Sequence, residues 1–344
     1  MLNISTQIRH LHKRFPLKIS RGVMTGSDNL FISIEENGIT GVGEMAPGET
    51  EGAKTADEGK KMLTDFCASE MSSNSIQENY DNAIGAGVAP CAVAALDMAL
   101  WDLRAKQASL PLYKLLGLSQ KVVPTSVTVG INPPEIVRER IPLILDGTGV
   151  KALKVKLGSP EGLDADQAMF AAMLEMTKNH SVALRVDANG GWTVPEAKKM
   201  MQWLADRGVE YIEQPLKRGE EEDLIHLFKD RPLPIFVDES CRVSSNIPKF
   251  ADRVDGVNLK LMKCGGITEA FRIVSTARAF GLKTMIGCMG ESSISIAAGA
   301  SIGSLFDYID LDSHLNLEPD PCSGAEMTDG KVVPSNSLGH GGKL

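Results

Sequence analysis

The sequence contains no stretch that approaches the roughly 18 consecutive apolar residues of a membrane-spanning helix. Its first residues, MLNISTQIRHLHKRF, also lack the apolar segment of a secretory signal peptide. We therefore expect a cytoplasmic protein that has no membrane partner.

Excess positive charge and paired cysteines are absent as well. The chain has 44 acidic and 36 basic residues, a formal charge of -8, and no Lys/Arg run that could follow a phosphate backbone. Its six cysteines include no CxxC pair, and most lie among apolar residues. We expect no nucleic acid partner, and reduced, buried thiols rather than disulfides or a zinc site.

The composition that remains is typical of a globular protein of about two domains, because 344 residues with 43% hydrophobic content can bury a large core. Up to about residue 60 the pattern is strand-like, and alternation around Asn37-Gly38 predicts a hairpin. Helical patterns follow, the longest from Ala89 to Gln107. The sequence thus predicts a small α+β domain over residues 1–120.

From Thr125 onward short apolar strands alternate with helical stretches, a pattern typical of a parallel β/α architecture. We expect helices over residues 195–207 and 268–281, among others, and eight strands, at 126–130, 152–157, 183–188, 211–215, 235–240, 256–261, 283–287 and 308–312. Eight strands in about 190 residues favour a closed barrel over an open doubly wound sheet. No turn between a strand and a helix carries the glycine-rich GxGxxG pattern of dinucleotide-binding sheets.

These barrel strands end in charged side chains. The residues are Lys154, Lys156, Asp187, Glu213, Asp238, Lys260, Asp310 and Asp312. In a barrel the carboxyl ends of the strands meet on the face that carries the active site. The carboxylates of Asp187, Glu213 and Asp238 would repel one another there unless a cation held them, and oxygen ligands favour Mg²⁺ or Mn²⁺ over zinc.

The lysines suggest proton transfer. Lys154 and Lys156 share one face of a strand, and we expect each ammonium group to lower the pKa of the other, which would make a lysine a usable base. Lys260 would lie across the barrel mouth, so a substrate held between Lys156 and Lys260 would meet an amine on each side of its reacting carbon. For Lys263 we expect a surface position.

Taken in order, the motifs KVK, RVDANGGW, EQP, VDES, NLKLMKCGGI and DLD resemble the enolase superfamily, its muconate-lactonizing subgroup and most closely the dipeptide epimerases. The resemblance implies an N-terminal α+β capping domain (1–120), a modified TIM barrel of (β/α)7β type (121–316) and a segment (317–344) that returns to the cap. It implies Asp187, Glu213 and Asp238 as Mg²⁺ ligands, with Mn²⁺ as a substitute, Lys156 and Lys260 as acid/base catalysts, and Lys154 as an electrostatic aid. The implied reaction inverts an α-carbon through a metal-stabilised enediolate.

In dipeptide epimerases an Asp-x-Asp motif binds the α-ammonium of the substrate, and Asp310 and Asp312 match that motif. The resemblance therefore implies a small-molecule dipeptide as the partner, and relatives are often homo-oligomers. An o-succinylbenzoate synthase or cycloisomerase-type lyase on the same fold would have no ammonium to bind. That lyase, and a metal-binding barrel with a scaffolding role, stay as alternatives.

Side-chain specificity is where this chain departs from the family pattern. Epimerases of Ala-Glu dipeptides carry an arginine in the capping loop that corresponds to ISRGVMTG, where Met24 stands at the expected position. This favours a hydrophobic or cationic C-terminal residue, and Glu49 and Glu51 of the second capping loop could face a cation. If Arg21 binds the substrate instead, the chain would be an L-Ala-D/L-Glu epimerase.

Overall fold

The computed structural model describes residues 2–69, 71, 75–146 and 149–344. Its N-terminal part is an antiparallel sheet of β1 (Asn3–Ile19), β2 (Gly22–Glu36) and β3 (Ile39–Met45). Helices α1 (Ala56–Ser69), α2 (Ile76–Gly85), α3 (Pro90–Gln107) and α4 (Leu112–Leu115) follow it. Asn37 and Gly38 both have positive φ, of 53° and 79°, which confirms the predicted hairpin turn between β2 and β3.

A parallel sheet of eight strands forms the barrel within the described residues. Its strands are β4 (Ser126–Val129), β5 (Ala152–Lys156), β6 (Ala183–Asp187), β7 (Ile212–Glu213), β8 (Ile235–Val237), β9 (Gly256–Lys260), β10 (Lys283–Gly287) and β11 (Tyr308–Asp310). Thr125, just before β4, forms a parallel bridge with Ile309, and its hydroxyl accepts a hydrogen bond from the backbone N–H of Leu311 (2.8 Å). The first and last strands therefore meet, and the predicted eight-stranded barrel is confirmed.

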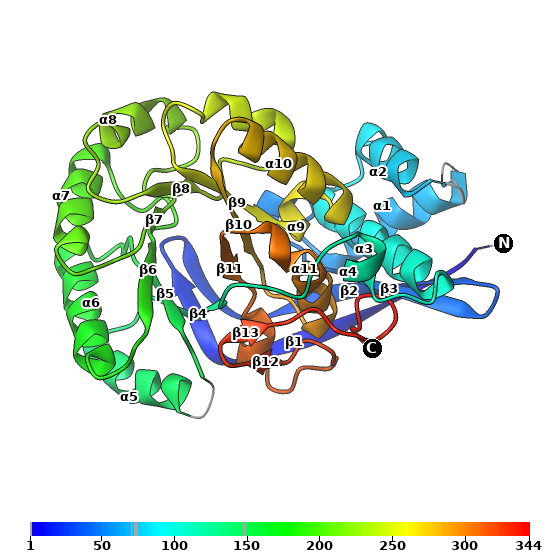
Figure 1. The fold of residues 1–344 in the computed structure, drawn as a ribbon, viewed down its shortest axis with the longest axis horizontal. Coiled ribbons are helices and arrows are strands. Elements are labelled where there is room, and N and C mark those ends of the chain that lie inside the picture. Colours follow the sequence, from blue (N-terminus) through cyan, green and yellow to red (C-terminus); the bar gives the residue numbers. More distant parts are fainter. Residues whose placement is uncertain (1, 70, 72–74, 147–148) are drawn as a thin grey trace.

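Helices cover the outside of the barrel, with α5 to α8 forming an arc on the side away from the N-terminal sheet (Figure 1). They are α5 (Pro134–Leu145), α6 (Leu163–Thr177), α7 (Val194–Ala205), α8 (Ile225–Phe228), α9 (Leu261–Cys264), α10 (Ile267–Ala279) and α11 (Ser293–Ser301). Short 3-10 turns are η1 (Glu49–Glu51), η2 (Glu221–Leu224), η3 (Ser244–Lys249), η4 (Gly303–Leu305) and η5 (Ser313–Asn316). The expected helices over 195–207 and 268–281 correspond to α7 and α10, and each begins and ends one or two residues earlier than predicted.

The N-terminal sheet reaches over the carboxyl ends of the barrel strands, and the long β1–β2 ribbon extends across to them (Figure 1). The backbone N–H of Ile131 donates to the carbonyl of Lys18 on this ribbon (2.8 Å). The C-terminal segment, which includes β12 (Met327–Thr328) and β13 (Lys331–Val332), returns to the N-terminal part, where Leu112 N–H donates to the carbonyl of Gly339 (2.6 Å). The mouth of the barrel thus lies beneath residues that are distant in sequence.

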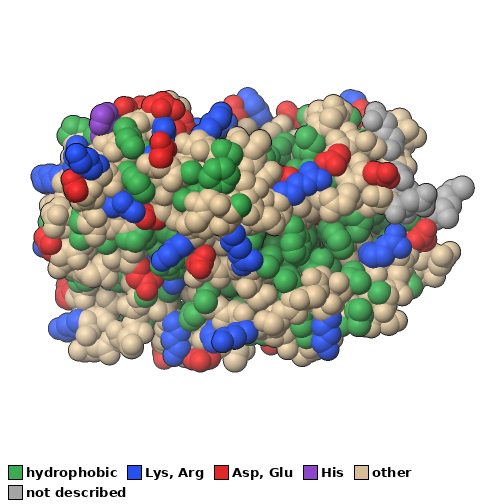
Figure 2. All heavy atoms as spheres, turned by 45° about the horizontal axis from the view of Figure 1, so that its top comes forward, with side chains coloured by type: hydrophobic (Ala, Val, Ile, Leu, Met, Phe, Trp, Pro, Cys, Tyr) green, Lys and Arg blue, Asp and Glu red, His purple; other side chains and the backbone are tan. Residues whose placement is uncertain are grey.

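All six cysteines are free thiols, and Cys91, Cys241 and Cys264 are buried. On the face shown in Figure 2, acidic and basic side chains are interspersed. No helix in the described ranges is long and apolar enough to cross a membrane.

Candidate active site

Three carboxylates converge at the mouth of the barrel. Asp187 and Glu213 are the last residues of β6 and β7, and Asp238 directly follows β8. Asp187 and Glu213 face each other in the register of the sheet. The three side chains are fully buried or nearly so, and each offers an oxygen that lies within 4.8 Å of the others. This convergence is the one that the positions of the strand ends predict.

The same carboxylates fit a hard divalent cation. Glu213 Oε2 and Asp238 Oδ2 are buried, and neither has a hydrogen bond of good geometry from any residue that the structure describes, although Lys154 and Lys260 lie at ion-pair distance from them. Burial raises the pKa of the Glu213 carboxyl to about 7, and the neighbouring Asp187 charge adds to that rise. A cluster of three buried oxygen donors with unused lone pairs is the donor set that Mg²⁺ prefers. These residues would hold the ion.

Lys154 and Lys156 project together from β5 toward the carboxylates. Lys156 Nζ lies 2.5 Å from Asp187 Oδ2. The fully buried Lys154 Nζ lies 2.7 Å from Glu213 Oε2 and 2.6 Å from Asp310 Oδ2. Burial alone would lower the pKa of Lys154, but the surrounding carboxylates outweigh it and raise that pKa well above its ordinary value. We expected Lys156 to lower the pKa of Lys154. That expectation is wrong, because the carboxylates of Glu213 and Asp310 lie against the Lys154 ammonium and outweigh the charge of Lys156.

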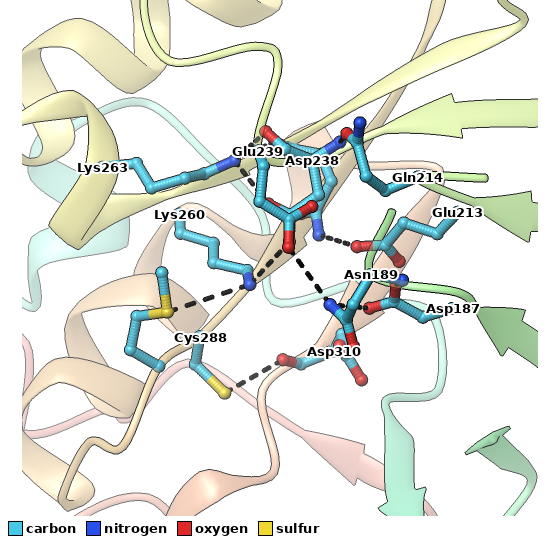
Figure 3. Close-up of polar contacts among 12 residues, drawn as sticks. Asp187, Asn189, Glu213, Gln214, Asp238, Glu239, Lys260, Lys263, Cys288 and Asp310 are labelled. Atoms are coloured by element: carbon cyan, nitrogen blue, oxygen red, sulfur yellow. Dashed lines mark hydrogen bonds and ion pairs between the residues drawn. The ribbon is translucent and has the colours of Figure 1, made fainter. Parts of the chain in front are cut away.

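Lys260 approaches from β9, four strands away from β5 in the sheet. Its Nζ lies 2.8 Å from Asp238 Oδ2 and 3.9 Å from Met289 Sδ (Figure 3). Burial would lower the pKa of Lys260, whereas the Asp238 charge raises it, and the net direction is upward. Two lysines on well-separated strands thus face the same group of acids.

Lys263 lies in the interior, so the expected surface position is wrong. Its side chain is 2% exposed, and its ammonium donates to Asp238 Oδ1 (2.5 Å) and to the backbone carbonyls of Cys241 and Asn258. The strand ends at Lys260, and the chain turns directly into α9, which directs Lys263 back toward Asp238 (Figure 3). Lys263 therefore holds this carboxylate in place.

Asn258 is a site residue that the sequence reasoning missed. Its Nδ2 donates to Glu213 Oε1 at 2.8 Å, and its Oδ1 is buried without a partner among the described residues. Asn258 precedes Lys260 by two positions on β9, so both side chains lie on the same face of the strand. That spacing was visible in the sequence and could have identified it.

Asn189 and Gln214 were missed as well. Asn189 donates to both carboxylate oxygens of Asp187, from its backbone N–H (2.8 Å) and its Nδ2 (3.2 Å). Gln214 Oε1 accepts from the backbone N–H of Asp238 (2.9 Å). Both amide residues have positive φ, 45° and 39°, a conformation that few residues other than glycine adopt. The Asn189-Gly190 pair was a sequence signal for it, whereas Gln214 had none.

Of the two aspartates of the DLD motif, Asp310 lies beside Lys154, and both line the same cavity. Asp310 ends β11, and its Oδ1 has no hydrogen-bond partner in the described part of the chain. Asp312 Oδ2 accepts from the backbone N–H of Thr128 at 2.6 Å. Burial raises the pKa of Asp312 to about 6, and the Asp310 charge adds to the rise. The pair forms a buried acidic wall that can accept hydrogen bonds from a cation.

A cavity of about 60 Å³ lies between the two lysines and the DLD aspartates. Its walls include Lys13, Leu17, Lys156, Lys260, Asp310 and Asp312. Lys13 and Leu17 belong to β1 of the N-terminal sheet, and the sequence reasoning did not select them. The cavity thus brings the lysines from opposite strands and the DLD aspartates to one small volume beneath the cap.

Arg21 and Met24 lie on the β1–β2 ribbon, outside the walls of this cavity. The Arg21 guanidinium pairs with Glu239 (2.7 Å) and donates to the carbonyl of Asn189 (2.9 Å). These contacts place it at a separate cavity of about 280 Å³. Met24 is 40% exposed and lies directly opposite Leu17 in the ribbon. The contact of either residue with substrate stays a prediction.

Glu49 and Glu51 of the second loop differ in environment. Glu49 is exposed and pairs with Lys54 at 3.0 Å. Glu51 is 5% exposed and accepts a hydrogen bond from the Thr50 hydroxyl at 2.6 Å. Neither is among the residues that line the cavity with the lysines, and their role toward a cationic substrate also stays a prediction.

Two known protein families match this chain. Residues 137–343 match the family described as enolase C-terminal domain-like. Residues 3–117 match the N-terminal domain of mandelate racemase and muconate lactonizing enzyme. The protein therefore belongs to this family of enolase-type barrel enzymes, as the order of its motifs predicted.

Individual proteins of this family are similar to the chain over nearly its whole length. The chain is 68% identical over 335 residues to a protein of Roseobacter litoralis named hydrophobic dipeptide epimerase, with 97% of each chain covered. It is 60% identical over 334 residues to a protein of the same name from a Flavobacteria bacterium, covering 97% of this chain and 96% of that one. Among solved structures, the dipeptide epimerase of Enterococcus faecalis V583 complexed with Mg and L-Leu-L-Tyr is 31% identical, with a TM-score of 0.88 and 99% of both chains covered.

Proposed function

We propose that the protein is a Mg²⁺-dependent dipeptide epimerase, an isomerase that inverts the α-carbon of the C-terminal residue of a dipeptide. The observation that carries this proposal is the placement of Lys156 and Lys260 on β5 and β9, both facing one cavity beside three convergent carboxylates. The relatives described above are named for the same activity.

The two lysines transfer protons on opposite faces of the α-carbon. The amine of one lysine takes the α-proton, and the electron pair of the broken C–H bond stays on the substrate. The ammonium of the other lysine then delivers a proton to the opposite face, which inverts the configuration. The buried ammonium of Lys154 adds positive charge beneath the reacting carboxylate.

Asp187, Glu213 and Asp238 would hold the cation. When bound, Mg²⁺ supplies the positive charge that stabilises the developing negative charge of the substrate carboxylate. Asn258, Asn189 and Lys263 fix the orientation of these three ligands through the hydrogen bonds described above. Mn²⁺, which has similar oxygen-ligand preferences, should replace Mg²⁺.

Asp310 and Asp312 bind the α-ammonium of the substrate. Asp310 Oδ1 is a buried acceptor without a partner in the described ranges, and Asp312 is secured by Thr128. A buried carboxylate pair of this kind stabilises a cation strongly. A cycloisomerase or an o-succinylbenzoate-forming lyase has no use for it, so we do not favour those alternatives.

The preferred C-terminal side chain is hydrophobic. The Arg21 guanidinium is paired with Glu239 and so is poorly placed to bind a glutamate side chain. Met24 offers no charge at the position where epimerases of Ala-Glu dipeptides carry an arginine. The names of the relatives at 68% and 60% identity agree with this preference.

The remaining parts of the proposal concern the whole chain. Residues 1–120 form the capping domain, 121–316 the barrel, and 317–344 the segment that returns to the cap. The family matches, which end at 117 and begin at 137, support the first division. A cytoplasmic location and a homo-oligomeric state complete the proposal.

A mass-spectrometric screen in D₂O tests the function. Purified protein with Mg²⁺ is incubated with pools of L,L-dipeptides sorted by C-terminal side chain, and each turnover leaves a gain of about one mass unit at the α-carbon. We expect labelling of hydrophobic pools and little labelling of Ala-Glu. Labelling of Ala-Glu alone would overturn the specificity, and no labelling in any pool would overturn the epimerase function.

A further inference from the structure

Strand β1 is irregular where it passes over the site. Its pairing with β2 is continuous from Asn3 to His12 and resumes at Leu17 opposite Met24. Residues 13–16 of β1 therefore face the single residue Thr25 of β2 and leave the ladder. Pro16, which has no backbone N–H, lies within this interruption.

The interrupted segment instead contacts the chain that follows the DLD motif. Lys13 forms an antiparallel bridge with Leu317, and the backbone N–H of Phe15 donates to Asn316 Oδ1 at 2.9 Å. Asn316 Nδ2 in turn donates to the carbonyl of Phe15 at 2.8 Å. These contacts fix β1 against the residues that come directly after Asp312.

This arrangement directs Lys13 into the cavity. Lys13 lines it together with Lys156, Lys260, Asp310 and Asp312. The next residue, Arg14, is exposed and lies against the ring of Phe15. Of these two adjacent cations, only Lys13 lines the reaction cavity.

The Lys13 ammonium also differs from the other lysines of the cavity. Lys156 and Lys260 each form an ion pair with a carboxylate, whereas the Lys13 side chain forms no ion pair or hydrogen bond within the described residues. Burial lowers the pKa of Lys13, and the charges of Cys288, Asp312 and Glu291 oppose that effect. The wall beside Asp312 therefore contains a partly buried cation that is not neutralised by an adjacent acid.

We propose that Lys13 selects the charge of the N-terminal side chain of the substrate, disfavouring Lys and Arg and favouring Asp and Glu at that position. The inference rests on the proposed function, in which Asp310 and Asp312 hold the α-ammonium. That ammonium and the N-terminal side chain leave the same carbon, so the side chain must lie close to the wall that contains Lys13.

The expected size of the effect follows from the burial. Two like charges several ångströms apart in a partly buried site repel strongly enough to change kcat/KM by about tenfold or more. The repulsion between Lys13 and the α-ammonium is the same for every dipeptide. It therefore cancels when dipeptides that differ only in the N-terminal side chain are compared.

The test compares L-Lys-L-Leu, L-Ala-L-Leu and L-Glu-L-Leu by deuterium incorporation at the leucine α-carbon in D₂O. The variants are Lys13→Met, which keeps the length and removes the charge, and Lys13→Arg, which keeps the charge. Lys18→Met is the matched control, because Lys18 lies on the same strand but pairs with Glu161 at 3.0 Å. Values of kcat/KM are determined for each dipeptide, and only their ratios are compared.

In Lys13→Met we expect the kcat/KM of L-Lys-L-Leu relative to that of L-Ala-L-Leu to rise about tenfold. The kcat/KM of L-Glu-L-Leu relative to that of L-Ala-L-Leu should fall. Lys13→Arg and Lys18→Met should keep the wild-type ratios. An active Lys13→Met enzyme with unchanged ratios would overturn this inference and leave the epimerase function standing. A wild-type enzyme that labels none of the dipeptides would instead overturn the proposed function.

Discussion

At the residue scale, Asp310 and Asp312 are assigned as the binding site of the substrate α-ammonium. The assignment rests on Asp310 Oδ1, a buried acceptor without a partner among the described residues, and on the Asp312 carboxylate, which Thr128 holds in place. Asp312→Asn should lower kcat/KM about 10- to 100-fold for dipeptides with a free α-ammonium, because a hydrogen bond to a charged group contributes about 1.5–3 kcal/mol. Acetylation of the substrate amine should remove most of this difference between variant and wild type. The measurement is the rate of deuterium labelling with each form of the dipeptide.

Asp307→Asn is the control for this prediction. Asp307 precedes β11 and accepts a hydrogen bond from the backbone N–H of Thr284 (2.9 Å), at the end of the strand that lies away from the mouth. Its activity should match wild type. If Asp312→Asn reduced the rates of the free and the acetylated substrates by the same factor, the aspartate would not be binding the ammonium.

Residue-level sequence reasoning succeeded where the backbone periodicity is regular and failed where the chain turns. The side chains of Lys154 and Lys156 share a face because they lie two residues apart in a strand. Lys263 was misplaced because α9 begins immediately after Lys260 and redirects the following residues. The pKa of Lys154 depends on acids from β7 and β11, whose proximity only the fold establishes.

At the scale of elements, the backbone of β3 packs directly against α3, because the β3 residues that face the helix are glycines. A Cβ placed on Gly43 would lie 2.0 Å from the carbonyl oxygen of Ala95, and one on Gly41 would lie 2.1 Å from that of Ala99. Gly43→Ala must separate the strand from the helix, so we expect a loss of about 1–3 kcal/mol in the free energy of unfolding. Differential scanning calorimetry should show a clearly lower thermal midpoint.

Gly85→Ala provides the comparison for this prediction. Gly85 ends α2, and a Cβ there would meet no heavy atom of the described residues within 4 Å. Alanine favours helix by up to about 1 kcal/mol over glycine, so this variant should be as stable as wild type or slightly more stable. Equal destabilisation by both substitutions would refute the close packing of β3 on α3.

The strands could be predicted because each is a short apolar run bounded by turn residues, but their ends could not. The predicted strand over 211–215 is only Ile212–Glu213, since Gln214 adopts a positive φ of 39° and leaves the ladder. The interruption of β1 after His12 had only Pro16 as a signal. The interrupted segment contacts Asn316, a residue 301 positions away from Phe15.

At the scale of the whole molecule, the buried acids link stability to pH and metal. Burial raises the pKa of Glu213 to about 7 and that of Glu291 to about 8, from ordinary values of 4.5. The folded chain thus binds these protons more tightly than the unfolded chain, and the stability that these two groups contribute falls as pH rises from about 5 to 8. The thermal midpoint of protein treated with a chelator should decrease over this range.

Mg²⁺ should reverse that trend, because its ligands must be deprotonated. The rise in thermal midpoint on adding Mg²⁺ should be larger at pH 8 than at pH 5.5, and Glu213→Gln should abolish most of it. A rise that is larger at pH 5.5, or one that persists in Glu213→Gln, would contradict the assignment of the metal ligands.

The overall architecture could be predicted from the order of the motifs, since charged residues at the ends of successive strands define one face of a barrel. The position of the cap over that face could be predicted only in outline. Lys13 and Leu17 reach the cavity through contacts between β1 and residues near 316, and such long-range pairings leave no local pattern in the sequence.

The most direct test of the central claim is the stereochemistry of α-proton exchange in Lys156→Ala and Lys260→Ala. Each variant is incubated in D₂O with Mg²⁺ and either the L,L or the L,D form of a hydrophobic dipeptide. Lys151→Ala is the control, because Lys151 pairs with Asp329 away from the site. We expect both catalytic variants to lose epimerisation, and each to exchange the α-proton of at most one epimer, a different one for each variant. Normal epimerisation by both variants would contradict the two-lysine mechanism.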